Sequence, residues 1–323
     1  MRRYLAGRLL QAAGVVFFVA TLTFVIVHLA PGDPIAAALA RPGVTEAVRD
    51  EWRRSLGLDL PVAEQYVRWL RNTVSGNLGY SIGHRRAVSA VLADALPRTL
   101  LLVVPALVLS FALGIGVGIL QAERPRGRRD RWLGRVLLAL YSVPDFWLAL
   151  LVLLLFAYRL PWFPAGGMID PVLHEYLGFG ARLADRLRHL VLPIVTLALL
   201  GAASIARYQR TALLDVLPSD FMRTAVAKGL PWRTAVRTHA LRNALLPVIT
   251  LAGLQLPLLV AGSVFVERVY SWPGMGLMTI NAVAARDYAL VSAGVVVFST
   301  VVAVGALLAD ITVALVDPRI RVE

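Results

Sequence analysis

The chain has 323 residues and a formal net charge of +13; 58% of its residues are hydrophobic, only 16% are charged and none is cysteine. Together with a mean hydropathy of +0.69, this composition excludes an ordinary soluble domain and indicates a membrane protein. Without cysteine there can be no disulfide, no thiol catalysis and no thiolate metal site.

Six apolar runs are long enough to cross a membrane as helices, since about 20 helical residues span a hydrocarbon core of about 30 Å. A β-barrel would need strands in which apolar and polar residues alternate, whereas these runs are apolar on all sides, so helices are favoured. The fourth run is short, and we expect His189 and a snorkelling Arg207 to extend it. The runs are 9–30, 99–121, 136–157, 190–205, 245–265 and 289–311.

The first run follows the basic start "MRRYLAGR", which is also how a signal peptide begins. Its apolar body is longer than that of a usual signal peptide, and the exit "HLAPGDP" is a poor cleavage site. We therefore expect this run to remain in the protein as a helix.

The distribution of cations predicts the orientation. The tail 1–8, the loop "ERPRGRRDRWLGR", the stretch 207–243 and the C-terminus carry most of the excess positive charge, so the positive-inside rule places them in the cytoplasm. The arginines after the first run count little, because loops above about 60 residues are translocated largely regardless of charge. The basicity is thus interpreted as topology, with anionic lipid headgroups as the local partner, and not as nucleic-acid binding.

Residues 31–98 predict a small ordered lobe outside the membrane. The segments "TEAVRDEWRRSLG" and "LPVAEQYVRWLRNTV" have apolar residues at helical spacing, and "GNLGYS" is rich in turn residues. The second outside loop, 158–188, contains "LPWFPAGG", whose Trp162 and Phe163 suit the level of the lipid headgroups.

The stretch "SDFMRTAVAKGLPWRTAVRTHALRN", residues 219–243, predicts a helical elbow in the cytoplasm. Ser219 or Asp220 can cap a first helix, Gly229 supplies the left-handed conformation that ends it, and Pro231 begins a second helix. Two ordered basic helices exceed what a connection needs, so we expect a partner to dock here; the alternative is an amphipathic helix lying on anionic lipid. Helical spacing puts three side chains of the first helix close to one face: Phe221, Ala225 and Lys228.

These motifs resemble the permeases of ABC transporters, in the form found in the dipeptide, oligopeptide and nickel family. "RTAVAKGL" followed by "RTHALRNALLPVIT" is similar to the EAA loop of those proteins, and the resemblance covers nearly the whole chain. Further matching segments follow in the family's order: "LTFVIVHLAPGDP", "LGLDLPVAEQYVRWL", "GNLGYS", "LPRTLLL", "SVPDFWLAL", "VFVERVYSWPGMG", "ARDYALV" and "DPRIR".

The resemblance implies an all-α, six-helix membrane protein of the type I importer fold, with both termini cytoplasmic, in the bacterial inner membrane. It implies a tail and first helix over 1–30 and an extracytoplasmic lobe over 31–98. A five-helix permease core over 99–315 follows, which includes the coupling loop 207–243, and 316–323 form a cytoplasmic tail.

In that family the helix before the loop glycine is the coupling helix, which sits in a groove of the ATPase subunit. The resemblance therefore assigns 221–230 to ATPase docking, with Thr224, Ala225, Lys228 and Gly229 on motif positions. The other loop residues that we assign to this coupling are Phe221, Arg223, Leu230, His239, Arg242 and Asn243.

The chain departs from the family pattern at several positions. Arg223, Thr224 and Ala225 stand where the general pattern has Glu-Ala-Ala, and Arg242 stands where it has proline. Both changes look usual for the first of two non-identical permeases, so the resemblance implies a related sister permease. Asn77 stands where the family often has Asp, which weakens any charge-dependent contact of that turn with an outside partner.

The implied partners are this second permease, one or two ABC ATPase subunits, an extracytoplasmic substrate-binding protein and membrane lipids. The pattern G-x-x-x-x-G-K-[ST] is absent from the sequence, so we expect no cofactor on this chain and place ATP and Mg on the ATPases. The expected cargo is a di- or oligopeptide, with nickel chelates, glutathione or other small solutes as alternatives. A secondary carrier that needs no ATPase is a more distant alternative.

Two acids lie inside the apolar runs. Asp310 is near the predicted cytoplasmic end of the last run and is interpreted as a boundary residue. Asp145 lies in the middle of the third run, directly after Pro144, where an ionised carboxylate must face protein or water. It either satisfies backbone groups freed by the proline or lines the path and meets the cationic end of a peptide.

Two glycine-containing segments suggest close packing or gating. Gly114 and Gly118 have the spacing that lets helices approach closely, and we favour packing over a moving gate. In "YSWPGMG" the residues Pro273, Gly274 and Gly276 predict a tight bend. By resemblance this bend, preceded by Glu267, is near the outer gate; otherwise it is a plain turn.

Enzyme functions find little support. H-E-x-x-H does not occur, and the five histidines are scattered over both predicted sides instead of being clustered with acids. We therefore predict a transport subunit without catalytic activity of its own, and not a membrane hydrolase, a glycosyltransferase or a channel that needs no ATPase.

Overall fold

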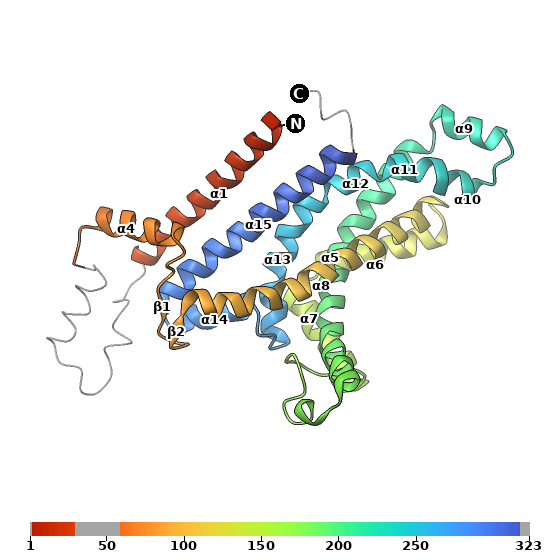
Figure 1. The fold of residues 1–323 in the computed structure, drawn as a ribbon. Coiled ribbons are helices and arrows are strands. Elements are labelled where there is room, and N and C mark those ends of the chain that lie inside the picture. The colour runs from red at the N-terminus through yellow and green to blue at the C-terminus, as the bar shows by residue number, and fades with distance from the viewer. Residues whose placement is uncertain (1, 30–58, 317–323) are drawn as a thin grey trace. The chain divides into compact units, whose positions relative to one another are not determined.

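A computed structural model describes residues 2–29 and 59–316 (Figure 1). These residues are almost entirely helical, with one hairpin of two short strands. Five helices are long and apolar enough to cross a membrane, and a bent pair of shorter helices makes a sixth crossing when it is counted as one. The five are α1 (Arg2–Leu29), α5 (Val88–Ala122), α8 (Phe179–Val216), α13 (Ala252–Val269) and α15 (Tyr288–Val316).

The predicted all-α membrane fold is confirmed, but several helices are longer than their apolar runs. α5 begins at Val88, so residues 88–98, which were assigned to the outer lobe, form its first turns. Charged residues such as Asp94 lower the hydropathy there without ending the helix. α8 extends beyond both His189 and Arg207, as the shortness of its run required. The predicted helix in "TEAVRDEWRRSLG" falls outside the described residues.

The third run is not one straight helix, which corrects the prediction. α6 (Arg128–Ser142) ends before an extended Val143, and α7 (Asp145–Leu153) then continues as the π-helical turn η1 (Leu154–Arg159). The two halves are bent by 109°. A residue that precedes proline avoids the helical conformation, so Val143 and Pro144 together break the helix. Asp145 therefore lies in the first turn of α7 and not in the middle of a helix.

The fifth run is also divided. The short helix α12 (Leu246–Thr250) has Pro247 in its first turn, and α13 follows after Leu251. α13 continues to Val269, past the predicted end at residue 265. The short apolar helix α14 (Met275–Ala284) then precedes α15.

The chain forms two compact units. One comprises 1–9, 99–273 and 304–323, and the other comprises 10–98 and 274–303. In the second unit, α4 (Val62–Val74) packs on α1 through an aromatic contact in which the Phe24 and Tyr66 rings are 5.2 Å apart. The Tyr66 and Thr21 hydroxyls are 2.8 Å apart. Within the described part of the predicted outer lobe, α4 is thus a helix fixed to the first span.

A buried carboxylate organises the turn-rich return to the membrane in the same unit. The strands β1 (Tyr80–Ser81) and β2 (Arg86–Ala87) form an antiparallel hairpin. Asp287 accepts hydrogen bonds from the Ser81 hydroxyl at 2.6 Å and from the Gly83 amide at 3.1 Å. Asp287 is 2% exposed. The motif "ARDYALV" therefore contains the residue that holds this hairpin.

In the first unit, α5 packs closely on α8 at two glycines. A Cβ on Gly114 would lie 2.6 Å from the Ile205 side chain, and one on Gly118 would lie 2.7 Å from Gln209, whereas Gly116 has open space. The predicted packing role of Gly114 and Gly118 is confirmed, because only small residues allow this approach.

The loop between η1 and α8 is ordered by polar contacts. His174, in the short helix η2 (His174–Tyr176), has Nδ1 2.6 Å from Asp185 Oδ2, and His189 Nδ1 lies 3.3 Å from Asp185 Oδ1. The amides of Leu173 and Val172 donate to the Asp170 carboxylate and hold its pKa below its ordinary value. The Gly167 amide donates to the Tyr270 carbonyl, which ties this loop to the end of α13.

Candidate functional site

The elbow begins with α9 (Asp220–Ala227), one turn of chain beyond α8 (Figure 1). Ser219 is extended, and its carbonyl accepts from the amides of Met222 and Arg223. The predicted side-chain cap is not formed, since neither the Ser219 hydroxyl nor the Asp220 carboxylate bonds a first-turn amide. Backbone geometry starts this helix, while Asp220 adds a favourable charge in its first turn.

Gly229 ends α9 as predicted. Its φ is +84°, in the left-handed region. The Leu230 amide donates to the Ala225 carbonyl and the Gly229 amide donates to the Val226 carbonyl, which together form a Schellman motif. This ending satisfies carbonyls that the helix leaves unpaired, and it directs the chain back towards the second helix.

α9 has a buried face and an outward face, and this corrects one prediction. Met222 and Ala225 are buried in a small core with residues of α8 and of the second helix. Ala225 therefore does not share a face with Phe221 and Lys228, which are exposed. Leu230 is half-buried, and the exposed residues of α9 and its end are Asp220, Phe221, Arg223, Thr224, Val226, Ala227, Lys228 and Gly229.

The second helix packs back on α9. It comprises α10 (Trp232–Ala235), the π-helical turn η3 (Val236–Ala240) and α11 (Leu241–Ala244), with Pro231 just before it. Its buried residues Ala235, Val236 and Ala240 join the core that holds Met222. The predicted docking residues His239, Arg242 and Asn243 are all exposed.

An acid that the sequence did not single out joins this elbow to α5. Glu123, directly after α5, pairs with Arg233 at 3.6 Å and with Arg237 at 3.5 Å. Its side chain is 9% exposed, and Ala122 beside it is buried in the core of the elbow. The elbow thus contacts two spans, α5 and α8.

Asp145 lines a cavity of about 350 Å³ within the first unit. Nearly half of the lining residues are leucines, and the further polar groups are Tyr141, Ser204, Tyr208 and Gln255. A Cβ on Gly262 would lie 2.9 Å from Asp145 Oδ2, so this glycine leaves room for the carboxylate. Among the side chains described, those of residues 6–29 and 59–312, no basic group pairs with Asp145; the amides of Trp147 and Leu148 donate to the Pro144 carbonyl.

The outer-gate candidates are buried or half-buried. Glu267 lies inside α13, is fully buried, and accepts a hydrogen bond of 2.7 Å from the Thr99 hydroxyl. The bend that follows has its positive φ at Ser271, with a value of +49°, whereas Gly274 has a φ of −96° and directly precedes α14. Pro273 is half-buried and Gly276 is buried in α14. Their role in gating stays a prediction.

Asp310 lies near the end of α15, and its carboxylate is 3.3 Å from the guanidinium of Arg8. Both side chains are partly exposed, which is usual for charged residues where a span meets the lipid headgroups. This placement agrees with the interpretation of Asp310 as a boundary residue.

Two family models match this chain. The model described as binding-protein-dependent transport system inner membrane component matches residues 114–322, and the model of the N-terminal region of these components matches residues 1–103. The chain belongs to this family of transporter membrane components. It is accordingly a multi-pass inner membrane protein, and its candidate coupling elbow and cavity lie in the part matched by the first model.

Named relatives match this permease over its full length. It is 41% identical to a putative peptide permease protein of Brucella ovis, over 100% of both chains. It is 38% identical to the oligopeptide transport system permease protein AppB of Bacillus subtilis, over 99% of this chain and 100% of the relative. It is 37% identical to the di/tripeptide transport system permease protein DppB of Pseudomonas aeruginosa, over 99% of both chains.

A solved structure shows the fold of the permease. The methionine ABC transporter MetNI in an inward-facing conformation contains a chain that matches with a TM-score of 0.58 and 20% identity, over 70% of this chain and 96% of that one. This likeness supports the predicted type I importer fold.

Proposed function

We propose that this chain is the permease subunit of an ATP-driven importer and that its cargo is a di- or oligopeptide. A second, related permease would complete the translocation path, one or two ATPase subunits would bind the elbow from the cytoplasm, and an extracytoplasmic binding protein would deliver the cargo. Family membership supports the class of transporter, and the names of the relatives favour a peptide over nickel chelates or glutathione.

One observation carries the proposal. The inner face of the elbow is packed in a core, whereas its outer face leaves apolar side chains exposed. Met222 and Ala225 fix α9 in a packed core, while Phe221 and Val226 remain 43% and 42% exposed beside Lys228. A connecting loop needs no such helix. Exposed aromatic and aliphatic side chains flanked by cations are suited to a groove on a partner protein.

The elbow can transmit movement because it has two attachments. It continues directly from α8, and Glu123 ties its second helix to the end of α5. A displacement of α9 by closing ATPases would therefore tilt α5 and α8 together. Such a rigid-body shift exposes a central path alternately to the two sides of the membrane. The ATP and Mg would be bound by the partners, and this chain would hold no cofactor.

Asp145 is the residue of this chain that we assign to the cargo. Its carboxylate faces a cavity and is only half-buried, and it lacks a basic partner in the described part of the chain. A carboxylate in a leucine-lined cavity attracts a cation, and the amino terminus of a peptide supplies one. A neutral sugar would gain nothing from this charge.

The test is affinity purification of the full tagged chain from its native membrane, followed by reconstitution of what co-purifies into vesicles. A P-loop ATPase and a second permease should co-purify, and peptide should accumulate only with ATP and the binding protein present. Lys228→Glu should reduce the amount of co-purified ATPase. Arg129→Glu, which reverses an equally exposed cation outside the elbow, should not. Solute movement by the purified chain alone would refute the proposal and favour a secondary carrier.

A further inference from the structure

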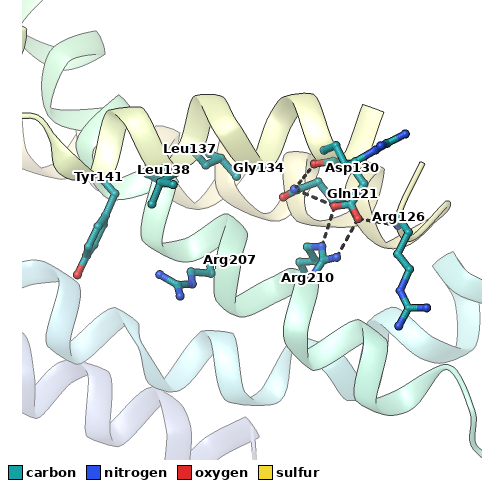
Figure 2. A pocket seen from close by; sticks show the side chains of 11 residues that line it. Gln121, Arg126, Asp130, Gly134, Leu137, Leu138, Tyr141, Arg207 and Arg210 are labelled. Carbon is teal, nitrogen blue, oxygen red and sulfur yellow. Dashed lines mark hydrogen bonds and ion pairs between the residues drawn. The ribbon is translucent and has the colours of Figure 1, made fainter. Parts of the chain in front are cut away.

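A second cavity, of about 460 Å³, lies between α6 and α8 in the first unit (Figure 2). It runs along α6, and its arginines belong to the parts of the chain that the positive-inside rule places in the cytoplasm. Four arginines line it: Arg126, Arg131, Arg207 and Arg210. One acid, Asp130, is also part of the lining, so the cavity carries a clear excess of positive charge.

Asp130 compensates only one of these arginines. Its carboxylate accepts two bonds of 2.8 Å from Arg210, one from the Arg126 amide at 2.9 Å and one from the Gln121 side chain at 3.1 Å. Figure 2 shows these groups gathered around Asp130 at one end of the cavity. This network fixes the turn before α6 to α8. It also uses the lone pairs of Asp130, which leaves none for the other guanidinium groups.

The guanidinium groups of Arg126, Arg131 and Arg207 have no acidic partner within residues 2–29 and 59–316. All three side chains are exposed to the space that they border. The amide oxygen of Gln121, which is 2% exposed, is buried without a hydrogen-bond donor. The cavity therefore offers several hydrogen-bond donors for an anion.

The opposite end of the cavity is apolar. Leu137, Leu138 and Ala203 line it, and Tyr141 closes it with a ring that Figure 2 shows away from the Asp130 network. Leu138 and Tyr141 are 61% and 65% exposed. A free phosphate would use only the arginine end. A molecule with an anionic head and an apolar tail would use both ends, and basic pockets between spans on the cytoplasmic side are suited to anionic lipid headgroups.

We propose that this cavity binds an anionic phospholipid of the inner leaflet. Arg126, Arg131 and Arg207 attract the phosphate and the other anionic oxygens of the headgroup from different parts of the cavity, and an acyl chain lies along Leu138 towards Tyr141. The site goes beyond the general attraction of basic loops to the membrane, because it requires three particular arginines.

The experiment is native mass spectrometry of the purified full chain in detergent, with phosphatidylglycerol and phosphatidylcholine of the same acyl chains as probes. The cavity variant is Arg126→Gln with Arg131→Gln and Arg207→Gln. The control variant is Arg124→Gln with Arg128→Gln and Arg129→Gln, which removes the same charge from exposed positions outside the cavity. Wild type should retain phosphatidylglycerol in preference to phosphatidylcholine, and the cavity variant should lose on the order of a hundredfold in this affinity.

The control variant should retain its affinity within about threefold. Equal losses in both triple variants would show that only bulk charge matters and would overturn the proposal, as would equal binding of the two lipids. Because a triple variant can unfold, Arg207→Gln alone, which leaves the Asp130 network intact, should still lose roughly tenfold. Glycerol 3-phosphate and inorganic phosphate in large excess should not displace the lipid; complete displacement would identify a site for soluble anions instead.

Discussion

Gly229 ends α9 with a backbone angle that few other residues adopt, and the position of the elbow depends on this ending. Its φ is +84°, yet no atom lies within 4 Å of the place where a Cβ would be. A larger side chain would therefore meet no steric obstacle and would strain only the backbone. A β-branched residue in this conformation costs about 1–2 kcal/mol, and the chain can relieve this strain by moving the end of α9.

We predict that Gly229→Val uncouples uptake from ATP hydrolysis while the six spans still insert into the membrane. Gly229→Asn is the matched control, because Asn tolerates the left-handed region and should keep most activity. Peptide uptake and ATP hydrolysis are measured in the same vesicles. Normal substrate-stimulated uptake by the Val variant would argue against a role for this ending in coupling.

Asp145 permits a test of the cargo that does not depend on stability. We predict that Asp145→Asn lowers uptake of peptides with a free amino terminus by about tenfold, which corresponds to roughly 1.4 kcal/mol of lost attraction. N-acetylated peptides should be affected little, because they lack the cation. Uptake of unblocked and of N-acetylated peptides is compared between wild type and the Asp145→Asn variant at equal protein abundance. An equal decrease for blocked and unblocked peptides would remove Asp145 from the binding role.

The sequence was most informative where one residue type meets a backbone requirement. Gly229 was predicted because few residues other than glycine end a helix with a positive φ. Glu123 and Gly262 could not be predicted in this way. Their roles depend on Arg233 and Asp145, which are distant in the chain and come close only in the fold. The same holds for Asp287 and its hairpin.

At the scale of elements, the contact between α5 and α8 depends on the two glycines that face Ile205 and Gln209. We predict that Gly118→Ala destabilises the protein by about 1–3 kcal/mol, because the new Cβ would overlap both a side chain and the Ala206 carbonyl. A Cβ on Gly116 would lie in open space, so Gly116→Ala should stabilise the helix by up to about 1 kcal/mol. Thermal unfolding in detergent distinguishes the two variants. Equal changes in their unfolding temperatures would contradict the close packing at Gly118.

The attachment of the elbow to α5 can be weakened without opening its core. We predict that Glu123→Gln changes the free energy of unfolding by no more than about 1 kcal/mol, because both arginine partners are well exposed and the pairs are long. Peptide uptake per ATP hydrolysed should nevertheless fall, since the second helix of the elbow would lose its tie to α5. An unchanged ratio of transport to hydrolysis would show that α8 alone carries the movement.

The number and order of the spans were predictable from hydropathy, but their breaks were not. The run 136–157 is apolar apart from a few residues such as Ser142 and Asp145, and a proline in such a run is compatible either with a kinked helix or with a full break. Tertiary packing decides between these outcomes, because both halves, α6 and α7, have α8 as a neighbour. The helix ends were missed for a related reason, since α5 and α8 continue beyond the apolar part of their sequences.

At the scale of the whole molecule, the lack of cysteine makes the orientation directly testable. His84→Cys and Lys228→Cys each introduce one reactive thiol at an exposed position, the first in the hairpin and the second in the elbow. We predict that a thiol reagent that cannot cross the membrane labels residue 84 in intact cells and labels residue 228 only in inside-out vesicles. Labelling of residue 228 from outside would reverse the topology and with it the proposed coupling.

The length of α8 determines how far a small tilt would move its ends in such a transporter. It is one helix of 38 residues, about 57 Å long, which reaches from the histidine pair at Asp185 to the chain just before the elbow. A tilt of only about 5° would move one end by roughly 5 Å relative to the other. In the proposed transporter, a movement at the outer end of α8 would therefore reach the elbow through one continuous helix, reduced only by bending at Pro193.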